Sequence, residues 1–329
     1  MYNVLRELEV WGPKPQWPIT PPSLPINLFG VSTMLKVLGG SSSKHIAFEV
    51  AKYLHTDFIM LNSRKFPDGE KYLRVLDDKI EGNSYLVIQS MYKTPDEYLM
   101  EYFFILDVLK SNGAKEIVSF IPYFAYARQD CEFNPGEPIS FKIVARLIEQ
   151  AGTDKIYTFD PHLHRIKSLS EVFTIPAYNI SILPTVVRYI LDNYALDDPV
   201  LIGPDAESEQ WTKMAAQETE LDYDVLEKVR YGDYEVEIRP RELDISDRNI
   251  ILIDDIISTG RTMAETIMML KDQGANNIYI GTAHPILIGD ALVNLYKAGA
   301  NFVVGSDSIP SPVSFVKCAP IIAEIIKKI

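Results

Sequence analysis

The sequence predicts an α/β protein with two similar doubly wound domains, each built on a parallel sheet. Short apolar runs, typical of strands buried on both faces, alternate with helix-like segments along most of the chain. The chain of 329 residues is also long enough for two domains of about 150 residues each. We therefore expect an N-terminal arm over residues 1–33, a first domain over 34–180 and a second domain over 181–329.

Residues 1–33 are expected to form an arm without a continuous helix. Prolines recur through this segment and favour an extended or polyproline-like path. They are Pro13, Pro15, Pro18, Pro21, Pro22 and Pro25. Trp11 and Trp17 are expected to pack either on the body of the protein or on another subunit, and a disordered tail is the alternative.

From Met34 onward, hydrophobic periodicity and Gly or Pro at the boundaries predict strands and helices in alternation. In the first domain, strands are predicted over 34–40, 58–62, 85–90, 116–124 and 155–160, and helices over 44–54, 97–110 and 141–152. In the second domain, strands are predicted over 199–205, 250–253, 278–285 and 302–307, and helices over 181–194, 263–274, 291–299 and 319–329. Thr262 and Glu265 are predicted to form a capping box, and Gly274 is predicted to end the helix that follows them.

One strand–turn–helix unit, over residues 249–262, carries a specific binding chemistry. Its apolar run ends at Asp254 and Asp255, where a parallel strand reaches the ligand-binding edge of an open sheet. The turn that follows supplies hydroxyl groups, a permissive glycine and a helix N-terminus, whose N–H groups suit a phosphate. Two carboxylates would repel a phosphate unless they bind either a divalent cation or the hydroxyl groups of a sugar. The unit therefore indicates a phosphorylated sugar. The alternative is an ordinary turn with a solvated acidic end.

The bulk properties exclude several classes of protein. A net charge of −13 argues against a nucleic-acid-binding surface. No stretch has the apolar length of a transmembrane helix, and the N-terminus lacks the pattern of a secretion signal, so no membrane partner is expected. The two cysteines, Cys131 and Cys318, belong to no ligand pattern and favour a reducing, cytoplasmic compartment.

Three further groups of residues do not identify a binding site by themselves. Arg128 and Gln129 follow a strand in PYFAYARQD and suit a polyphosphate and a purine edge, or else a surface loop with local packing. His162 follows a strand end in DPHLH, where a metal site has no evident third ligand and a structural histidine is the alternative. Lys228 and Arg230 alone indicate only a solvated charge pair on a hairpin.

Together, these motifs resemble those of ribose-phosphate diphosphokinases. The resemblance rests on YARQD, PGEPIS, the loop FPDGE over residues 66–70 and the turn IDDIISTGRT, and it covers the chain from about Met34 to the C-terminus. The turn also resembles the signature of type I phosphoribosyltransferases, whose fold both domains are expected to share. The DPHxH form looks more like archaeal members. The chain departs from the family pattern at Arg261, where a glycine is usual, and at Cys131, where a basic residue is common.

The resemblance implies a role for each matching residue. ATP is expected to contact Phe66, Asp68, Glu70, Arg128, Gln129, Asp130 and His162. Ribose 5-phosphate is expected to contact Asp254, Asp255, Ser258, Thr259, Gly260, Arg261 and Thr262. The expected catalytic residues are Lys228 and Arg230, and the expected Mg²⁺ ligands are His162 and Asp205. The loop over 66–70 is expected to reach a neighbouring subunit, which implies a homo-oligomer of at least two chains.

The implied activity is transfer of the β,γ-diphosphoryl group of ATP to the C-1 hydroxyl of ribose 5-phosphate, which yields phosphoribosyl diphosphate and AMP. Two alternatives stay open. A phosphoribosyltransferase would share the turn over 249–262 but would not explain FPDGE, YARQD or the doubled fold. A non-catalytic regulatory or assembly homologue would keep the architecture without turnover.

Overall fold

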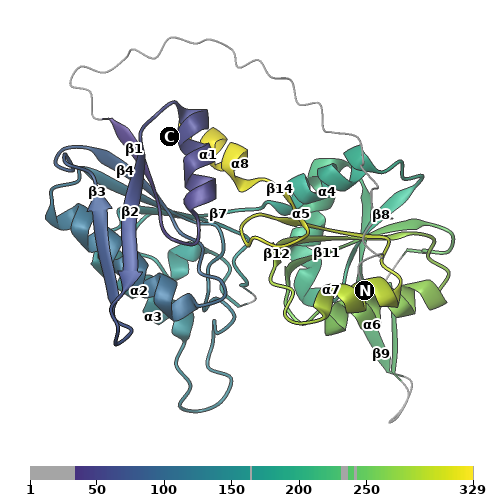
Figure 1. Cartoon of the computed structure of the whole chain (residues 1–329). Helices are drawn as coiled ribbons and strands as arrows, with labels where there is room; N and C mark the ends of the chain where they lie inside the picture. Colours follow the sequence, from purple (N-terminus) through teal and green to yellow (C-terminus); the bar gives the residue numbers. More distant parts are fainter. Residues whose placement is uncertain (1–33, 164, 231–235, 241–242, 329) are drawn as a thin grey trace, which may run out of the picture. The chain divides into compact units, whose positions relative to one another are not determined.

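The computed structural model describes residues 34–163, 165–230, 236–240 and 243–328, so the predicted arm over 1–33 lies outside the described residues. The described chain belongs to one compact unit that contains two sheets (Figure 1). The first sheet and its connections comprise β1 (Leu35–Gly39), α1 (Lys44–Leu54), β2 (Phe58–Lys65), β3 (Lys71–Leu76), β4 (Ser84–Ile88), α2 (Pro95–Ser111), β5 (Glu116–Ile121), α3 (Ser140–Ala151), β6 (Lys155–Phe159) and β7 (Ala177–Ile180).

The chain then forms the second sheet and the C-terminal helix. These elements are α4 (Leu183–Asn193), β8 (Pro199–Gly203), α5 (Glu209–Thr219), β9 (Asp222–Arg230), β10 (Val236–Pro240), β11 (Asn249–Ile257), α6 (Arg261–Asp272), β12 (Ile278–Pro285), α7 (Ala291–Ala298), β13 (Phe302–Ser306), β14 (Ser314–Val316) and α8 (Cys318–Lys327). Two short 3₁₀ helices, η1 (Leu169–Glu171) and η2 (Ala206–Ser208), complete the described secondary structure.

The two sheets have the same topology. Within the described residues, each sheet contains seven strands, in the orders β3-β2-β1-β4-β5-β6-β7 and β10-β9-β8-β11-β12-β13-β14. Neighbouring strands pair in parallel, except that β2–β3 and β9–β10 form antiparallel hairpins at one edge of each sheet. The prediction of two similar, doubly wound parallel sheets is confirmed, and the edge hairpins are an addition to it.

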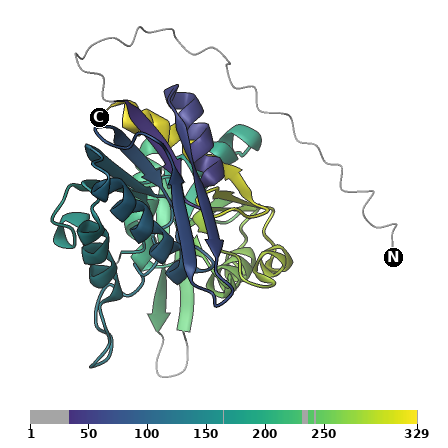
Figure 2. The ribbon, with the colours of Figure 1, turned by 60° about the vertical axis from the view of Figure 1, so that its left-hand side comes forward.

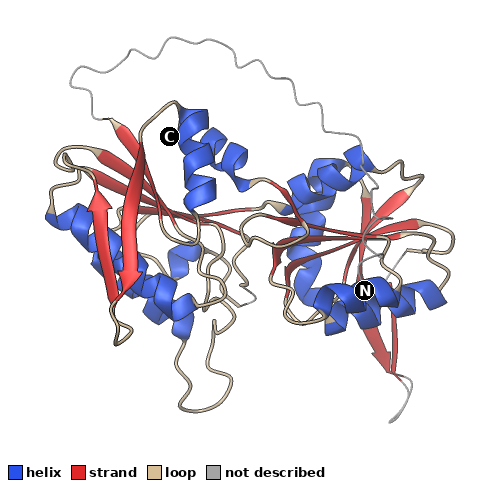
Figure 3. Ribbon diagram, in the orientation of Figure 1, coloured by secondary structure: helices blue, strands red, loops and turns tan. Residues whose placement is uncertain are grey.

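Burial explains why the central strands and the covering helices have different sequence patterns. β4 and β11 are nearly continuous apolar runs because helices cover both faces of each sheet (Figure 3). α3 buries only one side, through Phe141, Val144, Ala145 and Ile148, and keeps charged residues on the other. β5 ends at Ile121, earlier than predicted, because the next residue, Pro122, has no N–H to continue the ladder.

A shared apolar core connects the two sheets. One buried cluster contains Val37 and Phe159 of the first sheet together with Leu201 and Ile251 of the second. The C-terminal helix α8 also packs on α1, the first helix of the described chain (Figures 1 and 2). The predicted boundary after residue 180 falls between β7 and α4, and the division into two domains there stays a prediction.

Candidate active site

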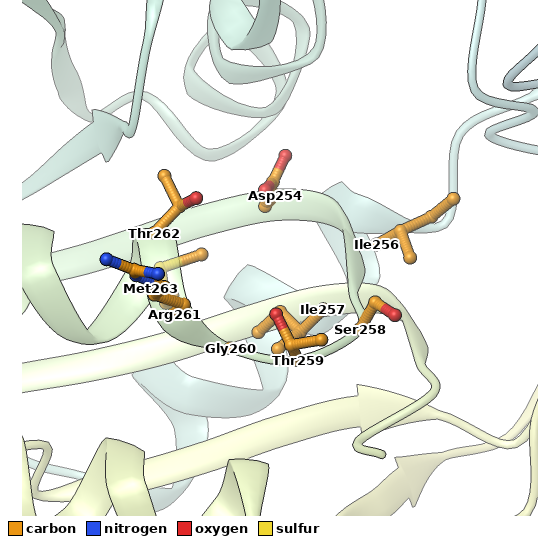
Figure 4. Close-up of a pocket in the computed structure, with 9 residues that line it drawn as sticks. All are labelled: Asp254, Ile256, Ile257, Ser258, Thr259, Gly260, Arg261, Thr262 and Met263. Atoms are coloured by element: carbon orange, nitrogen blue, oxygen red, sulfur yellow. The ribbon is translucent and has the colours of Figure 1, made fainter.

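β11, the loop after it and the start of α6 enclose a cavity in the second sheet. β11 carries the buried apolar residues Ile250–Ile253 and continues past Asp254 and Asp255 to Ile257, beyond the predicted strand end. It continues because its last two residues still pair with β12. The cavity has a volume of about 160 Å³ and is lined by Asp254 and residues 256–263 (Figure 4).

The loop at this cavity is held in a shape that suits an anion. The N–H groups of Leu287 and Ile288 donate to the carbonyls of Ile257 and Ser258 at 3.0 and 2.9 Å, which braces the loop from outside. Gly260 adopts a φ of 69°, in the left-handed region that favours glycine, and is the N-cap of α6. In this described helix no side chain caps the first turn. The first N–H groups and the positive end of the helix dipole are therefore available to a phosphate in the cavity.

The predicted capping box is wrong. α6 begins at Arg261 because Gly260 provides the N-cap, so Thr262 already lies in the first turn. Glu265 instead accepts from the Arg261 guanidinium at 2.9 Å. Arg261 is the first residue of α6, and its side chain is 85% exposed. The prediction that Gly274 ends this helix is confirmed, since it follows α6 with a φ of 90°.

Three aspartates crowd the end of the second sheet beside the cavity. Burial raises the pKa of Asp254 well above its usual range, and the charges of Asp255 and Asp205 raise it further. Asp255 is only 2% exposed. Asp205 is exposed and holds the start of η2, because its Oδ1 accepts the Ser208 N–H at 3.0 Å. A cation or the hydroxyl groups of a ligand would relieve this crowding of like charges.

His162 brings the first sheet into the same site. It follows β6, and its Nδ1 lies 2.7 Å from Oδ2 of Asp255. Sequence reasoning treated the histidine and the acids as separate motifs, and the structure brings them together. It also adds Tyr123, which the sequence did not single out. Burial raises the pKa of Tyr123, with Arg128 opposing and Asp255 reinforcing that rise, so its hydroxyl is within electrostatic reach of both groups. Its position just after β5, at the edge where His162 follows β6, could have identified it.

The donor atoms fit a magnesium ion that is held largely through a substrate. Among the described residues, no group of three or more His, Cys, Asp or Glu side chains could hold a metal ion by itself. Mg²⁺ often binds one or two protein carboxylates and completes its shell with water and phosphate oxygens. The charge of Asp205 acts on Asp254, and His162 contacts Asp255, so both predicted ligands border the same pair of acids.

The loop between β5 and α3 is folded on itself. The buried carboxylate of Asp130 accepts the Arg165 N–H at 2.8 Å and its guanidinium at 3.3 Å. The Gln129 amide donates to the Glu137 carboxylate at 3.1 Å. Arg128 is exposed. The contact of Arg128, Gln129 and Asp130 with ATP stays a prediction.

Phe66, Asp68 and Glu70 lie in the turn of the β2–β3 hairpin and are exposed. The Phe66 N–H donates to the Glu70 carbonyl at 2.8 Å and closes the turn. The Arg64 guanidinium lies 4.8 Å from the centre of the Phe66 ring and 4.4 Å from that of Tyr72. The hairpin therefore presents one aromatic ring and two carboxylates to solvent, where a nucleotide or a neighbouring chain can reach them.

Lys228 and Arg230 lie at the end of β9. Their antiparallel neighbours in β10 are Ile238 and Val236. The side chains of both residues lie outside the described part of the protein. Their catalytic role stays a prediction.

The shared topology shows that the acids belong to one sheet only. The central strand pairs β1–β4 and β8–β11 begin in the same register. Counted along these strands, Gln89, Ser90 and Ser41 of the first sheet correspond to Asp254, Asp255 and Asp205 of the second. The sugar-binding chemistry predicted for the 249–262 unit therefore has no acidic counterpart at these positions of the first sheet.

Two protein families match the chain in succession. Residues 35–152 match the N-terminal domain of ribose phosphate pyrophosphokinase, and residues 178–299 match the phosphoribosyl transferase domain. The ribose-phosphate pyrophosphokinase of Methanothermobacter thermautotrophicus is 38% identical over 291 residues, which cover 88% of this chain and 99% of that protein. The protein of the same name from Methanopyrus kandleri is 36% identical over 293 residues, covering 89% and 99%.

A solved structure has the same fold over nearly the same length. It is the crystal structure of phosphoribosylpyrophosphate synthetase from Mycobacterium smegmatis, which matches with a TM-score of 0.80 and 28% sequence identity. The match covers 89% of this chain and 98% of that one. The similarity therefore extends over both sheets rather than over the phosphoribosyl transferase domain alone.

Proposed function

The chain belongs to the ribose-phosphate pyrophosphokinase family, and we propose that it transfers the β,γ-diphosphoryl group of ATP to the C-1 hydroxyl of ribose 5-phosphate. The observation that carries this proposal is the joint site, in which His162 of the first sheet contacts Asp255 at the ligand-binding edge of the second. The cavity beside these residues suits the phosphorylated sugar, and the exposed loops of the first sheet suit the nucleotide.

The acceptor would bind in the cavity of the second sheet. Its 5-phosphate would accept hydrogen bonds from the first N–H groups of α6 and from the hydroxyls of Ser258, Thr259 and Thr262. Its ribose hydroxyls would donate to Asp254 and Asp255. Arg261, whose guanidinium is paired with Glu265, would contribute its backbone N–H rather than its charge.

The donor would bind between the first sheet and these acids. Arg128, Gln129 and His162 would contact ATP, with Asp130 holding the loop through Arg165. Phe66, Asp68 and Glu70 would complete the nucleotide site of a neighbouring subunit, because the hairpin that carries them is exposed. We therefore propose a homo-oligomer of at least two chains.

Magnesium would be held at His162 and Asp205 together with the phosphate oxygens of ATP, and it would supply charge neutralisation there. The chain itself would fix both substrates in line, with the C-1 oxygen aimed at the β-phosphorus. The new bond joins that oxygen to the β-phosphorus, and the hydroxyl proton is released to solvent. The bond from the β-phosphorus to the oxygen that bridges the α- and β-phosphates breaks, and AMP leaves with that bridging oxygen. Lys228 and Arg230 would stabilise the charge that builds on the phosphate oxygens.

Phosphorus NMR tests the proposed reaction directly. Purified protein with ribose 5-phosphate, ATP and magnesium should form AMP and phosphoribosyl diphosphate in equal amounts, and the Asp254→Asn variant should form neither. Consumption of phosphoribosyl diphosphate with release of diphosphate, in the presence of a nucleobase, would favour a phosphoribosyltransferase instead. Binding of both substrates without turnover would favour a non-catalytic homologue.

No helix in the described part of the chain is long and apolar enough to cross a membrane. Cys131 and Cys318 are both free thiols. We propose a cytoplasmic location on the basis of these thiols, because reduced cysteines are typical of that compartment.

A further inference from the structure

His284 is a buried histidine that connects the two sheets. It lies on β12 of the second sheet and is only 1% exposed. Its Nε2 lies 3.1 Å from the carbonyl oxygen of Phe159 and 3.2 Å from that of Asp160, at the end of β6 in the first sheet. Because carbonyl oxygens only accept hydrogen bonds, Nε2 carries the proton and donates to them.

The second ring nitrogen of His284, Nδ1, also has a hydrogen-bond partner. Nδ1 of His284 lies 2.8 Å from the hydroxyl oxygen of Ser308, and that hydroxyl also donates to the Ala283 carbonyl at 3.0 Å. The ring also packs against Tyr123 in a T-shaped arrangement, with 5.0 Å between the ring centres. Burial lowers the pKa of His284 to about 4, so the ring is neutral near pH 7 and keeps this donor and acceptor arrangement. The imidazole is thus locked in one orientation.

The peptide that His284 holds leads directly to His162. Asp160 has a φ of 31°, an uncommon conformation for a residue other than glycine, and its carboxylate accepts the Ile182 N–H at 2.8 Å. Two residues later, His162 reaches Asp255. One further contact from the second sheet holds this segment, since the Gln210 amide donates to the Leu163 carbonyl at 3.0 Å.

We propose that His284 is a positioning residue for the diphosphoryl transfer, which fixes the peptide after β6 so that His162 meets Asp255. The two carbonyls it holds are those of the residues that turn the chain out of the strand. β12 also pairs with β11 through Asp254 and the residues that follow it. One side chain therefore ties the histidine of the nucleotide site to the strand that carries the ribose acids.

A second inter-sheet hydrogen bond provides a matched control. The Ser90 hydroxyl, in the first sheet, donates to the Ser308 carbonyl in the second at 2.6 Å. Like the contacts of His284, this hydrogen bond is buried and joins the sheets, but it does not hold the segment over 159–163. Loss of general inter-sheet packing should therefore appear in a Ser90→Ala variant, whereas loss of positioning should not.

The test compares five variants of the full-length protein by steady-state kinetics with varied ATP. His284→Gln can place an amide N–H near the position of Nε2, whereas the shorter His284→Asn cannot. We expect the asparagine variant to lose about 10- to 100-fold in kcat/KM for ATP, since small misplacements of positioned groups have effects of this size. The glutamine variant and Ser90→Ala should stay within about threefold of the wild type, and KM for ribose 5-phosphate should change little in all three.

The last two variants, His162→Ala alone and His162→Ala combined with His284→Asn, ask whether the effect acts through His162. In a His162→Ala background, His284→Asn should add less than about a threefold further loss, because the side chain that it positions is already absent. Equal losses in the asparagine and glutamine variants, or a full additional loss in the His162→Ala background, would overturn the proposal. The inference rests on the proposed function, and the two fail differently. Absence of turnover in the wild type would overturn the function, whereas activity with additive effects would overturn only the positioning role.

Discussion

Replacing His284 by Gln should change how the stability of the protein depends on pH. Burial lowers the pKa of His284 to about 4, against an ordinary value of 6.5. Between these values the folded protein binds fewer protons than the unfolded chain does. The stability that the neutral ring contributes is therefore fully present above pH 6.5 and is lost as the pH falls towards 4.

The expected size follows from the same two values. Each tenfold difference in proton affinity corresponds to about 1.4 kcal/mol, so the complete loss is about 3 kcal/mol in the free energy of unfolding. Two titratable side chains act on the ring electrostatically. The charge of Asp255 raises the pKa of His284 and that of His162 lowers it, but burial is the larger cause. Burial also raises the pKa of Asp160 to about 7, and that residue acts in the opposite sense, stabilising the folded protein as the pH falls below this value.

Urea unfolding of the wild type and the His284→Gln variant separates these contributions. Both proteins should be measured at one concentration, since assembly would otherwise shift the apparent stability. Asp160 is present in both, so its titration largely cancels in the difference. From about pH 7.5 to about pH 4.5, the stability advantage of the wild type should shrink by about 2–3 kcal/mol. A difference that stays constant over this range would refute the conclusion that a neutral, buried ring is required here.

Other predictions concern Asp254, the loop between β11 and α6, and the β2–β3 hairpin. Asp254→Asn should abolish detectable binding of ribose 5-phosphate by calorimetry, yet raise the free energy of unfolding at neutral pH by about 1 kcal/mol, because it removes a crowded, desolvated charge. Gly260→Ala should cost about 1–2 kcal/mol and weaken ribose 5-phosphate binding, whereas Gly82→Ala, at a similar φ of 75° but outside the cavity, should cost stability alone. Arg261→Gly should leave kcat within about twofold of the wild-type value, because the Arg261 side chain is exposed and paired with Glu265. A larger gain in kcat would show that Arg261 impairs the site. Mixing inactive Phe66→Ala subunits with inactive Asp254→Asn subunits should restore part of the activity, because some sites would then combine an intact Asp254 with an intact Phe66 from the neighbouring subunit. No recovery of activity would contradict a hairpin that acts on its neighbour.

The sequence predicts the central elements well because their patterns are dictated by burial. The helix over 44–54 and the strand over 278–285 have the predicted bounds, since each is a clear amphipathic or apolar run between breaking residues. β3 and α5 were not predicted. β3 lies at the edge of its sheet and buries only Val75 fully, so its sequence, KYLRVL, carries little hydrophobic alternation. α5 mixes polar residues with alanines and buries only a narrow stripe, so its pattern is weak.

The sequence identifies individual residues of the candidate site more readily than it predicts how those residues lie relative to one another. Asp254 and the loop between β11 and α6 could be identified because strand, loop and helix follow one another in the chain. The contact between His162 and Asp255 spans 93 positions, and no local pattern encodes it. The capping box failed for a related reason. A Thr followed three residues later by a Glu fits the motif, but the left-handed conformation of Gly260 places the N-cap two residues earlier.

The two sheets repeat one topology, but they use the same edge in opposite ways. In the second sheet, the acids and the free end of α6 border an open cavity. In the first, the corresponding positions are occupied by polar groups that the chain itself satisfies. The buried carboxylate of Glu101 accepts the Ser41 N–H at 2.6 Å, its hydroxyl at 2.7 Å and the Gln89 amide at 3.2 Å. A carboxylate from α2 thus takes hydrogen bonds at the position where the second sheet is open to a ligand. The described residues at these positions of the first sheet therefore leave no acids open to a ribose, and in the reaction that we propose this sheet contributes His162 and the nucleotide loops instead.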